Sequence, residues 1–233
     1  MAPVIVALIP AYNEEKNIAQ VIRQTRELTS RVLVCDDGST DSTYSISLLS
    51  GAEVIKHSFN GGYGAALRSL FLKARNIQAD AFVTIDSDGQ HDTRFIPTLT
   101  DPIVKREADL VIGSRFLSKR LDFTPPHRRM AIKVITRLCD VNGHNGFTDL
   151  QSGFRAYSSH SLAVTCPRRT GMGASIEIIK RATRSGLRIR EVPVPIYYRD
   201  EDTSLLSSAF QFFDVLHSTL ASSLPSAIDR DRD

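Results

Sequence analysis

The chain has 233 residues, of which 42% are hydrophobic and 24% charged, and its formal net charge is +3 at pH 7. This suits one large globular domain, or one domain with an appendage, and the small charge argues against nucleic-acid binding. Three widely spaced cysteines form no zinc or disulfide pattern and favour reduced thiols. No basic leader precedes the first apolar run, and no run approaches about 20 residues, so we expect a cytoplasmic protein that does not cross a membrane.

Short apolar runs alternate with helical patterns over the first 115 residues. Five runs predict buried strands, at residues 4–9, 32–35, 53–56, 81–85 and 110–112. Helical patterns lie between them, and the first is predicted to begin at Asn13, whose side chain can cap a helix. The alternation predicts an α/β fold with a Rossmann-like, mostly parallel sheet flanked by helices. Ligands of such sheets bind at the carboxyl ends of the strands.

After Arg115 the pattern changes, which predicts a C-terminal subregion. A polar loop at 116–127 leads to a helix from about 128 to 142, with one basic and one apolar face. A helix is predicted at 176–185. The strand region at 187–198 is predicted to be an edge, because prolines interrupt it. The tail 201–233 predicts an amphipathic helix, packed on its own domain or lying on a membrane surface or partner, and a disordered end.

An acidic triplet, Asp86-Ser87-Asp88, follows the fourth predicted strand. Two aspartates two residues apart place two carboxylates on one side of a turn, where they can hold one hard divalent cation. Gln90 or His91 could add a ligand. Mg²⁺ takes one or two carboxylates and completes its shell with phosphate and water. The triplet alone is equally compatible with a polar turn, so this pattern leaves metal binding open.

A second acidic pair, Asp36-Asp37, follows the second predicted strand. Buried carboxylates there can accept hydrogen bonds from a base N–H or from ribose hydroxyls. Capping of the next helix is the alternative role. The segment 10–14 could add an aromatic face and a carboxylate to the same nucleotide. The glycines at 61–64 lack the dinucleotide-binding spacing, so a helix start with positive φ is favoured over phosphate contact.

Five motifs occur in order along the chain: IPAYNEE at 9–15, DDGSTD at 36–41, DSD at 86–88, GSRF at 113–116 and DLQSGFR at 149–155. The series resembles that of family-two inverting glycosyltransferases with the GT-A fold, and among them the dolichyl-phosphate mannose and glucose synthases. The resemblance covers roughly residues 3–200. It implies a GT-A catalytic domain at 1–200, with a nucleotide-sugar half at 1–115 and an acceptor half at 116–200, followed by the tail at 201–233.

The resemblance also implies a role for each matching residue. The residues expected to hold the nucleotide are Pro10, Ala11, Tyr12, Glu14, Asp37 and Ser87. Those expected to hold Mg²⁺ or Mn²⁺ are Asp86, Asp88 and Gln90. Those expected to contact an acceptor phosphate are Arg115, Arg129, Ser152 and Arg155. The catalytic set is Asp88, Arg115 and Asp149.

The expected reaction is inverting transfer of mannose or glucose from GDP-mannose or UDP-glucose to a dolichyl or polyprenyl phosphate. A lipid phosphate is already an anion, so arginines need only neutralise and aim it. A hydroxyl acceptor would need a base, for which Asp149 is the candidate. The protein is expected to lie at the cytoplasmic face of a membrane, on the surface or on a membrane-anchoring partner. A hydroxyl-acceptor enzyme and an inactive sugar-nucleotide-binding scaffold remain open alternatives.

Overall fold

The computed structural model describes residues 2–118, 124, 126–139 and 146–198. Within them one sheet contains the strands β1 (Ile5–Ala11), β2 (Arg31–Asp36), β3 (Glu53–Lys56), β4 (Ala81–Thr84), β5 (Leu110–Ser114), β6 (Arg155–Tyr157) and β7 (Ile189–Pro193). The helices are α1 (Ile18–Arg26), α2 (Thr43–Leu49), α3 (Tyr63–Ala74), α4 (Ile96–Val104), α5 (Pro126–Cys139), α6 (Ser159–Val164) and α7 (Ala174–Arg184), with a 3₁₀ turn, η1 (Thr93–Phe95). The predicted tail at 201–233 lies outside the described residues.

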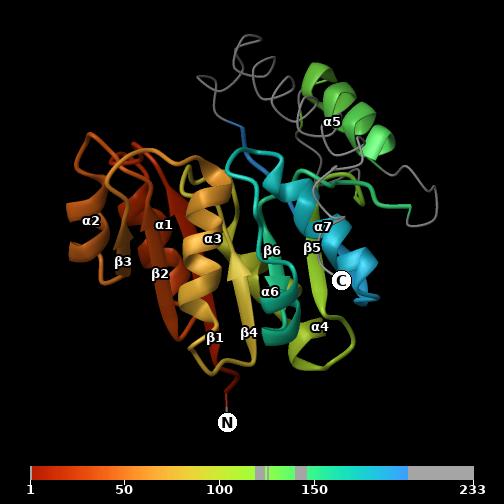
Figure 1. The fold of residues 1–233 in the computed structure, drawn as a ribbon, viewed down its shortest axis with the longest axis horizontal. Coiled ribbons are helices and arrows are strands. Elements are labelled where there is room, and N and C mark those ends of the chain that lie inside the picture. Colours follow the sequence, from red (N-terminus) through yellow and green to blue (C-terminus); the bar gives the residue numbers. More distant parts are fainter. Residues whose placement is uncertain (1, 119–123, 125, 140–145, 199–233) are drawn as a thin grey trace, which may run out of the picture.

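The sheet order is β3-β2-β1-β4-β6-β5-β7 (Figure 1). Every neighbouring pair is parallel except those of β6, which runs antiparallel to both β4 and β5. The predicted α/β class and mostly parallel sheet are confirmed, and β7 is the edge strand expected in 187–198. Strand β6 was not predicted, because three buried residues are too few to display a period.

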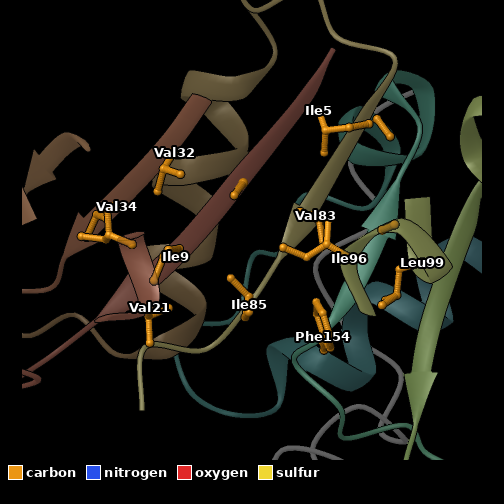
Figure 2. Packing of buried hydrophobic residues seen from close by; sticks show 14 of the residues in the cluster. Ile5, Ile9, Val21, Val32, Val34, Val83, Ile85, Ile96, Leu99 and Phe154 are labelled. Carbon is orange, nitrogen blue, oxygen red and sulfur yellow. The ribbon is translucent and has the colours of Figure 1, made fainter. Parts of the chain in front are cut away.

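Alternating side chains of the strands face two hydrophobic layers. On one face Val6 and Leu8 of β1 pack with α3, α6 and α7. On the other face Ile9 of β1 packs with α1 and α4, and Figure 2 shows this second cluster between Val21 and Leu99. Because successive side chains of a strand point to opposite faces of the sheet, apolar strand residues contribute to both hydrophobic layers. No helix among the described residues has the length and hydropathy needed to cross a bilayer.

The predicted helix start at Asn13 is wrong, because α1 begins five residues later at Ile18. Asn13 has a left-handed backbone with φ of 53°, which a helix cannot continue and which asparagine tolerates better than most residues. Its side-chain oxygen accepts from the backbone N–H of Thr40 at 2.9 Å. The Asn13 side chain therefore does accept a hydrogen bond from a backbone N–H, as a capping residue would. The donor is in the loop after β2 and not in a following helix.

Candidate active site

The five sequence motifs converge on one edge of the sheet. Parallel strands β1, β2, β4 and β5 all end there, and each is followed by one of the first four motifs. Antiparallel β6 begins at the same edge, which brings the last motif to it as well. Figure 1 shows α5 beyond this edge, next to the β5 and β6 part of the sheet.

The first two motifs are joined by hydrogen bonds between their loops. The backbone N–H of Asn13 donates to the Ser39 hydroxyl at 2.9 Å, and that of Glu14 donates to the Thr43 hydroxyl at 2.7 Å. The backbone N–H of Glu15 donates to the carboxylate of Asp41. Many polar residues of both motifs thus build the loop pair itself, while Tyr12 stays 44% exposed at its rim. Pro10 and Ala11 are buried at the end of β1.

The side chain of Asp37, the predicted nucleotide contact, is bonded to the loop that follows β3. Its two carboxylate oxygens accept the backbone N–H groups of Gly61 at 3.0 Å and Gly62 at 2.7 Å, and His57 Nδ1 lies 2.6 Å from Oδ1. The preceding residue, Asp36, is fully buried, and its Oδ2 has no hydrogen-bond partner among the described residues. Burial of a carboxylate oxygen without a donor is unfavourable, so Asp36 is a further candidate for a ligand contact, while the nucleotide contact by Asp37 stays a prediction. The sequence pattern named both aspartates as possible nucleotide contacts, and the family resemblance selected Asp37.

The carboxylate of Asp86 is enclosed by nearby His91 and by two residues more distant in the sequence, Tyr63 and Gly153. Tyr63 donates its hydroxyl to Oδ1 at 3.4 Å, and His91 Nε2 lies 3.0 Å from Oδ2. Burial alone would raise the pKa of Asp86, but the hydrogen bond to His91 and the nearby positive charges, including that of Arg115, hold it below the usual value. Gly153 completes the enclosure, because a Cβ there would lie 2.5 Å from both carboxylate oxygens. Asp86 is therefore an ionised carboxylate in a fixed position, and its predicted role as a metal ligand stays a prediction.

The remaining metal candidates, Asp88 and Gln90, lie in the turn that follows β4. Asp88 Oδ1 accepts the backbone N–H of Gln90 at 2.9 Å, and Ser87 is buried between the two aspartates. No group of three histidine, cysteine or acidic ligands occurs in the described part of the chain. Two carboxylates would leave several coordination positions of a bound ion for other ligands. That arrangement fits Mg²⁺ or Mn²⁺ bound together with a diphosphate and does not fit a closed structural metal site.

Arg115 and Asp149 form a buried, two-pronged ion pair. Arg115 Nε donates to Asp149 Oδ2 at 2.6 Å, and Nη2 donates to Oδ1 at 2.9 Å. Nη1 donates to the hydroxyl of Tyr198 at 3.0 Å. Although burial opposes the charge, Asp149 raises the pKa of Arg115, which stays cationic. Because both oxygens of Asp149 already accept from Arg115, the predicted role of Asp149 as a general base does not fit this geometry.

Two predicted phosphate contacts lie inside the protein. Arg155 is 1% exposed, and its terminal nitrogens donate to the carbonyls of Ser175 at 2.9 Å and Leu150 at 2.8 Å. Ser152 is equally buried, and its hydroxyl accepts from the backbone of Phe154. A fully buried guanidinium that satisfies backbone carbonyls is a structural element, so a direct phosphate contact by Arg155 does not fit.

The other cations of the acceptor half lie on or near α5. Arg129 is half-buried and donates to the carbonyl of Thr124 at 3.4 Å. Lys133 and Arg115 each lie 5.8 Å from the ring centroid of Phe116, which brings the two cations to one aromatic side chain. Positive charge therefore extends from the sheet edge onto α5, as the basic helix face predicted.

The glycines at 61–64 open α3, as the sequence favoured. Gly62 has φ of 92°, and the carbonyl of Thr170 accepts the N–H groups of Gly64 at 2.6 Å and Ala65 at 3.3 Å. A Cβ at Gly64 would collide with the carbonyl of Arg169. The first donors of α3 are therefore occupied by the 168–171 loop, and they form no phosphate cradle.

A mostly parallel sheet with acidic groups at its strand ends, facing a cationic group across one edge, defines a glycosyltransferase of the GT-A type. The chain belongs to glycosyl transferase family 2, whose family model matches residues 6–164. A solved glucosyl-3-phosphoglycerate synthase from Mycobacterium tuberculosis, in complex with Mn²⁺ and UDP-glucose, has a TM-score of 0.75 at 25% identity. The likeness covers 97% of this chain and 81% of that one.

Two relatives match over nearly the whole chain. The UDP-N-acetylglucosamine–dolichyl-phosphate N-acetylglucosaminyltransferase of Methanococcus voltae is 29% identical, over 95% of this chain and 97% of the relative. The undecaprenyl-phosphate mannosyltransferase of Micrococcus luteus is 29% identical, over 87% of each chain. The names of these relatives share a polyprenyl-type phosphate and differ in the sugar.

Proposed function

We propose that the protein transfers a hexose, mannose or glucose, from a nucleotide sugar to a dolichyl or polyprenyl phosphate, with inversion and with Mg²⁺ or Mn²⁺. The acceptor assignment depends on the ion pair between Arg115 and Asp149. Both carboxylate oxygens of Asp149, the candidate base, accept hydrogen bonds from Arg115 and are not available to take a proton. An acceptor that is already an anion needs a guanidinium and no base. The relatives named for dolichyl and undecaprenyl phosphate support the same acceptor class.

The donor side is proposed to combine Asp36 with Asp86 and Asp88. A buried carboxylate oxygen accepts hydrogen bonds only, so Asp36 would favour a base that presents an N–H, as both uracil and guanine do. Asp86 and Asp88 would hold the metal ion, which, when bound, stabilises negative charge on the leaving diphosphate without a proton. Tyr63, His91 and Gly153 would keep the carboxylate of Asp86 oriented toward the metal ion.

The acceptor side is proposed to centre on Arg115. A guanidinium has five N–H donors, and three of those of Arg115 bond to Asp149 and Tyr198. Among the described residues the other two have no recorded acceptor, and they are proposed to bind phosphate oxygens. The charge of Arg115 also lowers the pKa of Asp86, so the acceptor cation and the metal ligand influence each other directly. That proximity suits in-line attack, in which the anion approaches the sugar from the side opposite the diphosphate.

We also propose that the protein works at the cytoplasmic face of a membrane, as a peripheral protein or with a membrane partner. Helix α5 supports this, because Met130 and Val134 are exposed apolar side chains one turn apart and Lys133 and Arg137 are exposed cations beside them. Such a face suits an anionic lipid surface. Flotation with anionic liposomes tests it, and equal recovery with neutral and anionic liposomes would contradict it.

The test of the activity is a screen of GDP-mannose, UDP-glucose and other nucleotide sugars for transfer of radiolabel into butanol-extractable lipid. Each donor is assayed with polyprenyl phosphate, with and without Mn²⁺, and after EDTA. We expect one donor to give lipid-linked sugar that EDTA abolishes. Transfer to a hydroxyl compound with indifference to polyprenyl phosphate, or nucleotide binding without turnover, would reject the proposal.

The metal role is tested by Asp88→Asn, which keeps the size of the side chain and removes its charge. We expect transfer to fall by at least about 100-fold, because oxyanion stabilisation of this kind is worth several kcal/mol. The matched control is Asp101→Asn, which breaks an exposed pair with Lys105 on α4. Full activity of Asp88→Asn would refute the metal assignment.

A further inference from the structure

Glu191, on edge strand β7, lies behind the proposed acceptor site and was not singled out by any motif. Its carboxylate accepts four hydrogen-bond contacts from three donor groups of one short turn. The backbone N–H of Thr148 reaches both oxygens, at 3.0 and 2.9 Å, the Thr148 hydroxyl reaches Oε2 at 3.0 Å, and the backbone N–H of Asp149 reaches Oε1 at 3.0 Å. One carboxylate therefore fixes the backbone of residues 148–149.

The turn held by Glu191 is the one that carries the partner of Arg115. Asp149 bonds to the guanidinium through both oxygens and also accepts the backbone N–H of Arg115 at 3.2 Å. The Thr148 hydroxyl lies 2.6 Å from that of Ser114, the residue before Arg115. A continuous set of contacts thus runs from Glu191 through the turn to the guanidinium.

We propose that Glu191 is a positioning residue for Arg115: it anchors the 148–149 turn so that Asp149 holds the guanidinium ready for the acceptor anion. The proposal rests on the proposed function only for the identity of that anion. Glu191 itself touches no substrate. It acts through Asp149, from a strand paired in register with β5, where Ile112 faces Glu191 three residues before Arg115.

The chemistry of the contacts requires a carboxylate. Both oxygens of Glu191 face N–H donors, so a glutamine would turn its own NH₂ group toward a backbone N–H. Burial, together with the charge of Asp149, raises the pKa of Glu191, against the effect of its hydrogen bonds. Half-buried Glu191 thus adds a second acid beside the buried pair of Arg115 and Asp149, and loss of its donors would be unfavourable.

The experiment is a double-mutant cycle on the full chain, with Glu191→Gln, Arg115→Lys and the double variant. Lysine keeps the charge of Arg115 and loses the two-pronged geometry. We expect Glu191→Gln to raise the KM for polyprenyl phosphate about tenfold, as loss of charged hydrogen bonds does, while the KM for the nucleotide sugar changes less than about twofold. In the Arg115→Lys background the same substitution should change the acceptor KM less than about twofold.

Two controls keep the outcome decisive. Glu107→Gln breaks an exposed ion pair with Arg190, also on β7, and should leave both KM values unchanged. Thr148→Ala removes only the hydroxyl contacts to Glu191 and Ser114, and it replaces Glu191→Gln if that variant fails to fold. We expect it to raise the acceptor KM about threefold, with the same loss of effect in the Arg115→Lys background.

The positioning role would be overturned if Glu191→Gln raised the acceptor KM by the same factor in the wild-type and Arg115→Lys backgrounds. It would also be overturned if Glu191→Gln raised the donor and acceptor KM values equally. If the wild-type protein transfers nothing to polyprenyl phosphate, the proposed function fails. The thermal-unfolding midpoints of the same variants then test whether Glu191 and Arg115 are coupled through the 148–149 turn. Midpoint shifts of Glu191→Gln and Arg115→Lys that add in the double variant would overturn it, and shifts smaller than their sum would support it.

Discussion

Gly153 occupies the tightest point beside the metal candidate Asp86, and Gly153→Ala is the sharpest test of that site. The added Cβ would lie 2.5 Å from both carboxylate oxygens, whereas an ordinary contact begins near 3.4 Å. Gly153 is fixed from behind, because its carbonyl accepts the Thr84 hydroxyl at 2.7 Å. The carboxylate must therefore retreat by about 1 Å, and a shift of that size costs about 100-fold in rate when a catalytic group is misplaced.

The assay for Gly153→Ala is the transfer rate as a function of Mn²⁺ concentration, with thermal unfolding measured on the same samples. We expect about 100-fold lower kcat/KM and a higher Mn²⁺ requirement. The matched control is Gly186→Ala, which forces an alanine into φ of 65° in open space and costs about 1 kcal/mol of stability. Gly186→Ala should lower the unfolding midpoint and keep the activity. Wild-type activity and metal response in Gly153→Ala would refute the reasoning.

Three further outcomes follow from the described contacts. Tyr63→Phe removes one of the groups that orient Asp86, so we expect a several-fold higher Mn²⁺ requirement with little change of the unfolding midpoint, and an unchanged requirement would contradict this. Burial, with nearby carboxylates, raises the pKa of Cys35 to about 12, so its thiol should resist iodoacetamide at pH 8 until urea unfolds the chain, and labelling of the native protein would contradict this. The hydrogen bond from Arg188 holds the pKa of Asp109 below its unfolded value, so this pair stabilises the fold above about pH 4 and loses its effect as the pH falls through the folded pKa. Asp109→Asn should therefore lower the thermal-unfolding midpoint slightly at pH 7, because Arg188 is exposed, and lower it less at pH 3; an equal effect at both pH values would contradict this.

The sequence predicts the parallel strands and their polar ends because each depends on a local pattern. The run before Asp86 is apolar on both faces, and the acidic triplet after it stands at the predicted edge, where the structure has it. The predicted order of elements follows from the same alternation. These features needed no information about distant residues.

The features that were missed depend on contacts between distant residues. Arg115 and Asp149 are 34 residues apart, so neither motif indicates that the acid is occupied by the arginine. Glu191 contacts the turn 42 and 43 residues before it. Arg155 was expected to contact an acceptor phosphate, and only the buried carbonyls around it reveal a structural role. A side chain whose role is to bind another side chain far away in the sequence produces no local sequence pattern that could predict that role.

The position of β6 between β4 and β5 has a consequence for how the chain reaches its native state. Strands β4 and β5 are complete by residue 114, yet the strand that joins them arrives only with residues 155–157. During synthesis both strands would expose unpaired edges over that interval, and such edges favour association with other chains. A fragment ending near residue 115 would lack the strand that joins β4 to β5, so the donor and acceptor halves should unfold in one transition and cannot be exchanged as separate modules.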